Sequence, residues 1–150
     1  MALDITIRNQ LQDYMARLVS PIKLLANVDE SASSQEMLGM LEEVTSLSEK
    51  ITLNKETDVS KRIPSFEVNR EIDPTGITFA GIPSGHEFTS FVLALLQAGG
   101  HPLKLDAEKI EQIKNIQGKF HFETYISLSC HNCPDAVSYT HLTLPTKRIV

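Results

Sequence analysis

Residues 120–134 read Phe-His-Phe-Glu-Thr-Tyr-Ile-Ser-Leu-Ser-Cys-His-Asn-Cys-Pro, and this stretch decides how the rest of the chain is interpreted. Apolar side chains recur with a period of two from residue 120 to residue 128, which is typical of a buried strand. Cys130 and Cys133 follow at the point where that strand should end. The pattern predicts a strand that leads into the start of a helix carrying two cysteines.

The two cysteines have the spacing of a redox pair. At the start of a helix, unpaired backbone N–H groups and the positive end of the helix dipole stabilise a thiolate, which is the attacking species in disulfide exchange. Cys130 would form a mixed disulfide with a substrate, and Cys133 would resolve it. Pro134 fits the first turn of the helix, where its missing N–H costs little.

Two other interpretations of the cysteine pair stay open. It could be half of a zinc site, although the chain contains only two cysteines and no histidine pair at ligand spacing follows them. It could also be a permanent disulfide or two inert thiols, because Cys-x-x-Cys alone has many chance matches. A strand directly before the pair is the arrangement of thioredoxin-like sites, and it favours redox chemistry.

The composition limits the class of protein further. A chain of 150 residues with 41% apolar content can form one ordinary domain or two very small ones. There is no signal segment, and the longest apolar run, residues 88–98, is too short to span a bilayer, so we expect a cytoplasmic protein without a membrane partner. A net charge of −5 argues against a nucleic-acid partner.

The first hundred residues predict a complete series of helices and strands. Hydrophobic periodicity and breaker residues place them at residues 7–18 (helix), 22–28 (strand), 33–50 (helix), 51–53 (strand), 65–70 (strand), 77–82 (strand) and 88–98 (helix). Ser33 and Glu36 form a capping box for the second helix. The first two strands should be parallel and the last two an antiparallel hairpin. The Phe88 and Phe91 stripe of the last helix is expected in the core, not in a cofactor pocket.

This order of elements is one whole thioredoxin-like unit, over residues 1–102. The position after its first strand, residues 29–33, holds no cysteine, so this unit is expected to be redox-inactive. A second, shorter start follows over residues 103–136, with Asp106 as the cap of a helix and then the strand that leads to the cysteines. We therefore predict an α/β fold of tandem thioredoxin-like folds, the first complete and the second truncated after its Cys-x-x-Cys.

Two blocks of sequence, residues 85–102 and 122–135, closely resemble the amino-terminal domain of the flavoprotein subunit of bacterial alkyl hydroperoxide reductase. The resemblance implies two fused thioredoxin-like folds, of which only the second keeps a dithiol. It also implies a bacterial cytoplasmic parent, a homodimer, whose missing carboxy-terminal part holds FAD, a second cysteine pair and an NAD(H) site. The implied partner is a two-cysteine peroxiredoxin, which the dithiol reduces.

The same resemblance assigns roles to individual residues. Cys130 would be the exposed attacking thiolate and Cys133 the resolving thiol. The Ile63–Pro64 bond would be cis, the alternative being an ordinary trans proline. Glu87 and His86 would face the dithiol across the interface between units, with Pro134 also beside it. Glu87 could then accept a proton or tune the thiolate pKa, or it could be only a first-turn acid of its own helix.

After Asp135 the sequence departs from the family. Residues 137–150 do not resemble it, and residues 137–146 are similar to a translated sequencing adaptor, so we interpret the tail as non-native. Residues 143–146 are expected to break the helix, and Tyr139 and His141 receive no role.

The expected function is that of the longer parent: a thiol-disulfide relay between an FAD/NADH reductase module and a peroxiredoxin. The chain itself should hold no cofactor or metal and be inactive, because the second unit lacks most of its sheet. A stand-alone glutaredoxin-like oxidoreductase would use the same cysteines without a flavin. A non-catalytic docking domain would tolerate their replacement.

Overall fold

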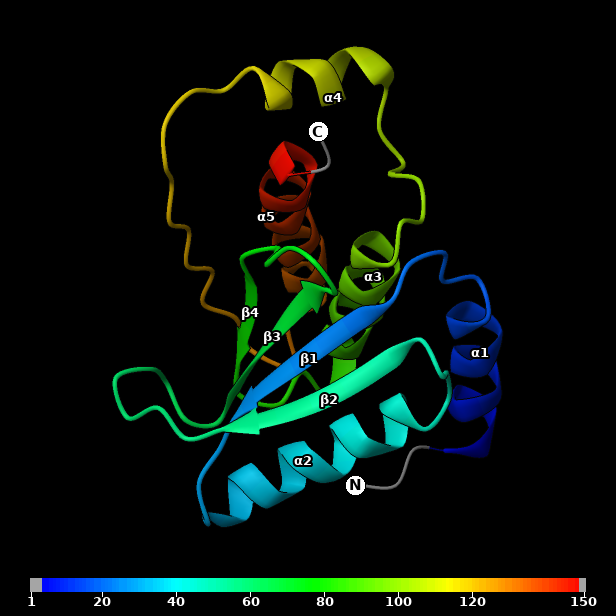
Figure 1. Ribbon diagram of the computed structural model, residues 1–150, viewed down its shortest axis with the longest axis vertical. Coiled ribbons are helices and arrows are strands. Elements are labelled where there is room, and N and C mark those ends of the chain that lie inside the picture. Colours follow the sequence, from blue (N-terminus) through cyan, green and yellow to red (C-terminus); the bar gives the residue numbers. More distant parts are fainter. Residues whose placement is uncertain (1–3, 149–150) are drawn as a thin grey trace.

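A four-stranded sheet with the order β2-β1-β3-β4 forms the centre of the fold (Figure 1). The computed structural model describes the backbone of residues 4–148 and the side chains of residues 4–141. The strands are β1 (Ile22–Asn27), β2 (Ile51–Glu56), β3 (Ser65–Arg70) and β4 (Ile77–Ala80). β1 is parallel to β2, and β3 is antiparallel to both β1 and β4. The predicted parallel pair and the predicted hairpin are confirmed.

One face of this sheet packs on the helices. Along β1, Ile22, Leu24 and Ala26 are buried, whereas Lys23 on the opposite face is exposed. The three helices that contribute to the same hydrophobic core are α1 (Ile5–Met15), α2 (Ala32–Thr45) and α3 (Phe88–Ala98). A strand with alternating buried and exposed residues is what a sheet with one covered face requires.

Aromatic side chains fill the centre of the core. Phe66 on β3 stacks on Phe79 of β4 with ring centroids 5.2 Å apart, and Phe91 of α3 meets Phe66 edge to face at 5.1 Å. Phe88 is half-buried and packs against the same cluster. The phenylalanine stripe of α3 is therefore core packing, as the sequence predicted.

Three local predictions are wrong. α2 begins after Ser31, whose hydroxyl accepts a hydrogen bond from the Ser34 N–H, so the capping box at Ser33 does not form. The reason is that Ser31 takes the extended backbone conformation that a capping residue needs. α1 ends at Met15, three residues before the predicted end at residue 18, and its Ile7 is exposed. β2 continues to Glu56, three residues past its predicted end, because it stays paired with β1.

The part of the chain after the first unit is more open. A short turn of 3-10 helix, η1 (Gly85–Glu87), leads into α3, and α4 (Ala107–Lys114) follows with no buried residue. Figure 1 shows α4 at the far end of the molecule from β2. The last helix is α5 (Cys133–Arg148), which packs beside α3.

The strand predicted over residues 120–128 is wrong for this structure. Within residues 4–148 the last strand is β4, and the stretch from 119 to 128 is extended chain outside the sheet. Its apolar side chains are exposed, with Phe122 53% accessible to solvent. A strand pattern becomes a strand only when neighbouring strands supply backbone partners and cover one face, and the described chain offers this segment neither.

The predicted break of the last helix is also wrong, since α5 runs through Pro145. A proline removes one backbone hydrogen bond of the helix. Upstream of it, Val137 and His141 are buried, so packing holds the earlier turns of α5 in place. The interpretation of residues 137–150 as a non-native tail is not tested by this finding and stays a prediction.

Candidate functional site

The candidate site is the corner where the extended segment meets α5. Cys130 and Cys133 are joined by a disulfide, with their Cα atoms 5.5 Å apart. Cys133 is the first residue of α5, and the Cys130 N–H donates to the Ser127 carbonyl oxygen at 2.9 Å, which closes a tight turn before the helix. Both cysteines are half-buried. The cysteine pair thus lies at a helix start, as the sequence predicted, but a turn and not a strand precedes it.

Two of the side chains expected beside the dithiol lie at this corner. The His86 ring, from the first unit, lies against the His131 ring, with centroids 4.3 Å apart, and His131 is one of the two residues between the cysteines. Pro134 lies in the first turn of α5, where its carbonyl oxygen accepts a hydrogen bond from the Ser90 hydroxyl at 3.5 Å. The structure therefore brings His86 and Pro134 to the cysteine corner.

Glu87 is the most unusual charged residue near the corner. Its side chain is only 2% exposed, and its Oε1 atom has no hydrogen-bond partner among the described residues. It lines the same cavity as Phe122 and His141, between the first unit and the cysteine-bearing segment. A buried carboxylate oxygen without a partner is costly, and it is often kept for a chemical role. A direct role toward the sulfurs stays a prediction.

The cis-proline lies in the first unit. The Ile63–Pro64 peptide bond is cis, as predicted. Pro64 immediately precedes β3, whose first residue, Ser65, is paired with Asn27 at the end of β1. Pro64 is thus next to the end of β1, from which the chain continues to Ser31 at the start of α2. The cis-proline therefore lies beside the strand-to-helix connection of the first unit, which contains no cysteine.

A charged cluster that no sequence pattern predicts ties the extended segment to the first unit. Arg62 pairs with Glu123 at 3.2 Å, and Tyr125 donates its hydroxyl proton to Glu123 at 2.7 Å. The hydrogen bonds from Tyr125, Arg62 and His121 lower the pKa of Glu123 to about 2. Because Arg62 and Glu123 are far apart in sequence, no local pattern could have revealed the pair.

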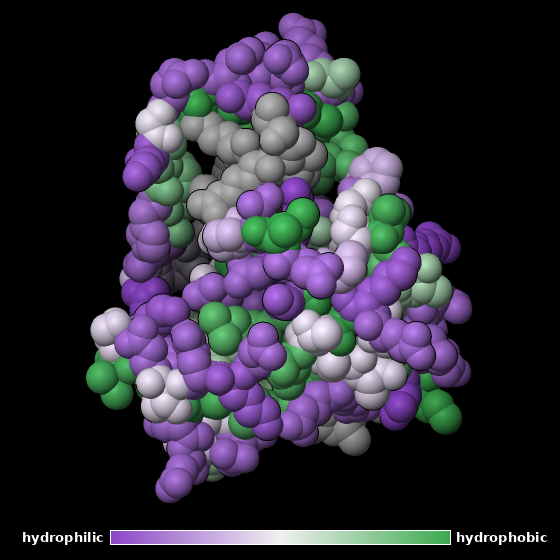
Figure 2. All heavy atoms as spheres, viewed as in Figure 1, coloured by the Kyte–Doolittle hydropathy of each residue, from purple (hydrophilic) through white to green (hydrophobic). Residues whose placement is uncertain are grey.

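The cluster borders a large cavity between the open face of the sheet and the extended segment. The cavity has a volume of about 1100 Å³ and is lined by β3, β4, residues 120–126 and the first turns of α5. Figure 2 shows the molecule hollowed beside this segment. The cavity extends along this segment as far as Leu128, two residues before Cys130.

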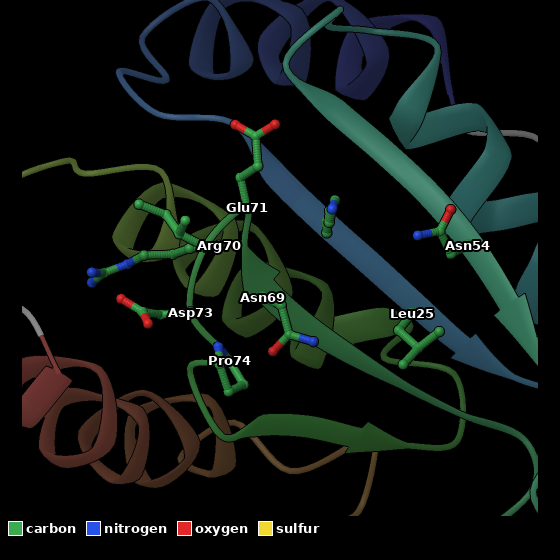
Figure 3. Close-up of a pocket in the computed structure, with 9 residues that line it drawn as sticks. Leu25, Asn54, Asn69, Arg70, Glu71, Asp73 and Pro74 are labelled. Atoms are coloured by element: carbon green, nitrogen blue, oxygen red, sulfur yellow. The ribbon is translucent and has the colours of Figure 1, made fainter.

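A second, smaller cavity of about 230 Å³ lies near the turn after β3. Figure 3 shows Asn54 and Asn69 pointing toward the space above Leu25, whereas Arg70 points away from it. It contains no cysteine or histidine, so we assign it no chemistry.

Other kinds of site are absent from the described residues. No group of three or more His, Cys, Asp or Glu side chains is placed to hold a metal ion there. None of the helices in that part of the chain is long and apolar enough to cross a membrane.

The sheet order, the cis-proline before β3 and the cysteine pair at a helix start define a mixed α/β chain with a thioredoxin-like fold. Its sequence matches the amino-terminal region of the alkyl hydroperoxide reductase AhpF. The Pseudomonas aeruginosa relative of this name is 51% identical over 140 residues, which is 93% of this chain and 27% of that protein. The Escherichia coli relative is 47% identical over 140 residues. No family model matches the chain.

Solved structures agree with this assignment. The N-terminal domain of AhpF from Enterococcus faecalis matches with a TM-score of 0.86 and 29% identity, over 98% of this chain and 76% of that one. A protein disulfide oxidoreductase from Aeropyrum pernix matches with a TM-score of 0.84 at 22% identity, which supports the fold alone. A Bacillus subtilis relative, 51% identical over 137 residues, carries the name NADH dehydrogenase. The chain spans about a quarter of the length of these sequence relatives.

Proposed function

We propose that the Cys130–Cys133 pair is the dithiol of an electron relay that reduces a two-cysteine peroxiredoxin. The observation that carries the proposal is a disulfide closed at the start of α5, in a chain that matches the amino-terminal region of AhpF. A helix start supports a thiolate, and a spacing of three residues lets the second cysteine reach the first.

The exchange transfers two electrons in two steps. In the reduced pair, the Cys130 thiolate attacks one sulfur of the partner's disulfide, forms a mixed disulfide and releases the other partner sulfur as a thiolate, which takes up a proton. Cys133 loses its proton and attacks the Cys130 sulfur, so that the second partner sulfur leaves as a thiolate and takes up a proton while the Cys130–Cys133 disulfide closes. The partner has gained two electrons and two protons. A reductase module outside this chain, using FAD and NADH, would return the pair to the dithiol.

The chain itself is expected to pass electrons weakly or not at all. Phe122, Ile126 and Leu128 are exposed directly before the cysteines, so the segment that leads to Cys130 lacks the apolar packing that a strand within a sheet would have. Thiol exchange needs the attacking sulfur in line with the partner's disulfide, and a corner that follows a segment without this packing should reach that geometry less often.

A chimera tests the relay. Residues 1–135 would replace the matching region of the Pseudomonas aeruginosa protein, and NADH oxidation would be followed with its peroxiredoxin and a peroxide. We expect peroxiredoxin-dependent NADH oxidation, lost in both Cys130→Ser and Cys133→Ser. Reduction of a model disulfide by the unfused chain with dithiothreitol and no flavin would favour the glutaredoxin-like alternative. Full activity of the double serine variant would leave only docking as a function.

We also propose that Glu87 acts on the dithiol. Glu87 is buried on η1, which packs against α5. In its ionised form this carboxylate would oppose the effect of the helix dipole and raise the thiol pKa, or accept a proton from the resolving thiol. Glu87→Gln keeps the shape and removes the charge. We expect the thiol of reduced Cys130 to be alkylated faster near pH 6 in this variant, and an unchanged pH profile would contradict a role for the carboxylate.

A further inference from the structure

The first unit holds the cysteine corner from both sides. On one side, a methyl group on Gly85, the first residue of η1, would come within 3.2 Å of the Leu128 carbonyl oxygen, so the backbones meet closely there. On the other side, the Ser90 hydroxyl donates to the Pro134 carbonyl oxygen. These contacts place η1 and the first turn of α3 directly against the residues that flank the disulfide.

Between these two contacts, His86 reaches the loop of the disulfide itself. Its ring and the His131 ring lie 4.3 Å apart at an interplanar angle of 55°. His131 follows Cys130 directly in the chain, so the contact between the two rings lies one residue from the attacking cysteine. An imidazole near a thiolate stabilises it by hydrogen bonding or, when protonated, by charge.

We propose that His86 is a positioning residue, which holds the His131 imidazole beside Cys130 through the contact between their rings. The inference rests on the proposed function and deepens it, because it gives the cysteine-free unit a part in tuning the dithiol. Both histidines are exposed, so their contact contributes little to folding stability and its loss should leave the fold intact. Two carboxylates near the corner, Glu87 and Asp135, act in the opposite direction and stay unchanged in the test.

The test measures the reactivity of Cys130 in the full chain, reduced and carrying Cys133→Ser so that one thiol remains. The rate of alkylation by iodoacetamide would be followed from pH 5 to pH 9. We expect His86→Ala to slow alkylation about threefold near pH 6, since half a pH unit in the thiol midpoint changes the thiolate fraction by about that factor. His86→Phe keeps a ring against His131 and should restore the original profile.

Two controls separate positioning from other effects. His121→Ala removes another exposed histidine, which pairs with Glu123 on the extended segment, and it should leave the profile unchanged. In a His131→Ala background, His86→Ala should have no further effect, because the two residues act as one unit. Circular dichroism would verify that each variant keeps the fold.

Three results would overturn the proposal: an unchanged profile in His86→Ala, an equal effect with and without His131, or a His86→Phe variant that behaves like His86→Ala. The alkylation assay needs no protein partner. A failed peroxiredoxin assay would therefore count against the proposed relay without deciding the role of His86, and the reverse also holds.

Discussion

Two corners of the molecule place a pair of side chains three residues apart at the start of a helix, and they differ in chemistry. At the first corner, Ser31 caps α2, and Ser31 and Ser34 both donate hydrogen bonds to the Asp29 carboxylate. These bonds, with the one from Ser31 the strongest, lower the pKa of Asp29 to about 2. At the second corner, Cys130 and Cys133 close a disulfide. The same spacing serves helix capping in one case and thiol chemistry in the other.

The corners also differ in their support. The serine corner follows β1, which has a neighbouring strand on each side. The cysteine corner follows an extended segment outside the sheet, and the Arg62–Glu123 ion pair and the Ser90–Pro134 hydrogen bond hold this part of the chain to the first unit. Side chains thus set what a corner can do, while the neighbouring strands set how firmly it is held.

The substitution with the largest expected effect tests whether the first unit is packed more tightly than the segment before Cys130. Phe91→Ala removes a fully buried ring of the first unit, and it should lower the free energy of unfolding by about 3–5 kcal/mol. Phe122→Ala, in the exposed segment, should change it by no more than about 0.5 kcal/mol. Urea unfolding followed by circular dichroism measures both. Equal losses would mean that the segment is as well packed as the core.

A smaller effect should appear with pH. His141 on α5 is buried edge to face against Phe79, and burial lowers its pKa from the ordinary 6.5 to about 4. Between these two values His141 is protonated in the unfolded chain but neutral in the folded chain. The free energy of unfolding therefore falls as the pH drops below 6.5, and the loss is complete below about 4. The full loss in the free energy of unfolding is about 3 kcal/mol, because each unit of difference between the two pKa values corresponds to about 1.36 kcal/mol.

The control for this pH effect is His141→Phe, which keeps a ring against Phe79 and cannot take up a proton. Unfolding in urea at pH 7 and at pH 4.5 would be compared for both chains. A pH dependence of the same size in both would assign it to other groups.

The smallest effect concerns the serine corner. Ser31→Ala removes the oxygen that accepts the Ser34 N–H at 3.3 Å, and it should cost about 1 kcal/mol. Asp106→Ala is the matched control, since Asp106 stands at the same position before α4 without a side-chain capping bond, and it should cost less than about 0.5 kcal/mol. A thermal or urea midpoint lowered equally by both substitutions would show that the capping hydrogen bond of Ser31 adds no measurable stability.

Much of the first unit could be predicted from sequence because its signals are local. The alternation in β3, the apolar run of β1 and the phenylalanine stripe of α3 each lie within one element, and the structure places all three as expected. The cap of α2 could not be assigned correctly because three of its first four residues, counting from Ser31, are serines, and only the backbone conformation distinguishes them.

The rest of the site depends on contacts between distant residues. The alternation before Cys130 predicts a strand, but the pattern describes only the segment and not whether neighbours exist. Likewise, no local signal connects His86 with His131 or Arg62 with Glu123, which meet only because the chain folds back on the first unit. The cysteines themselves were identifiable because their spacing carries its own chemical meaning.

The exposed segment has a consequence for handling the molecule at high concentration. Phe122, Ile126 and Leu128 are exposed apolar side chains on a segment outside the sheet, which is the kind of surface through which separate molecules associate into aggregates. We therefore expect molecules to associate through this stretch when the protein is concentrated. Phe122→Lys should delay the resulting turbidity and loss of monomer.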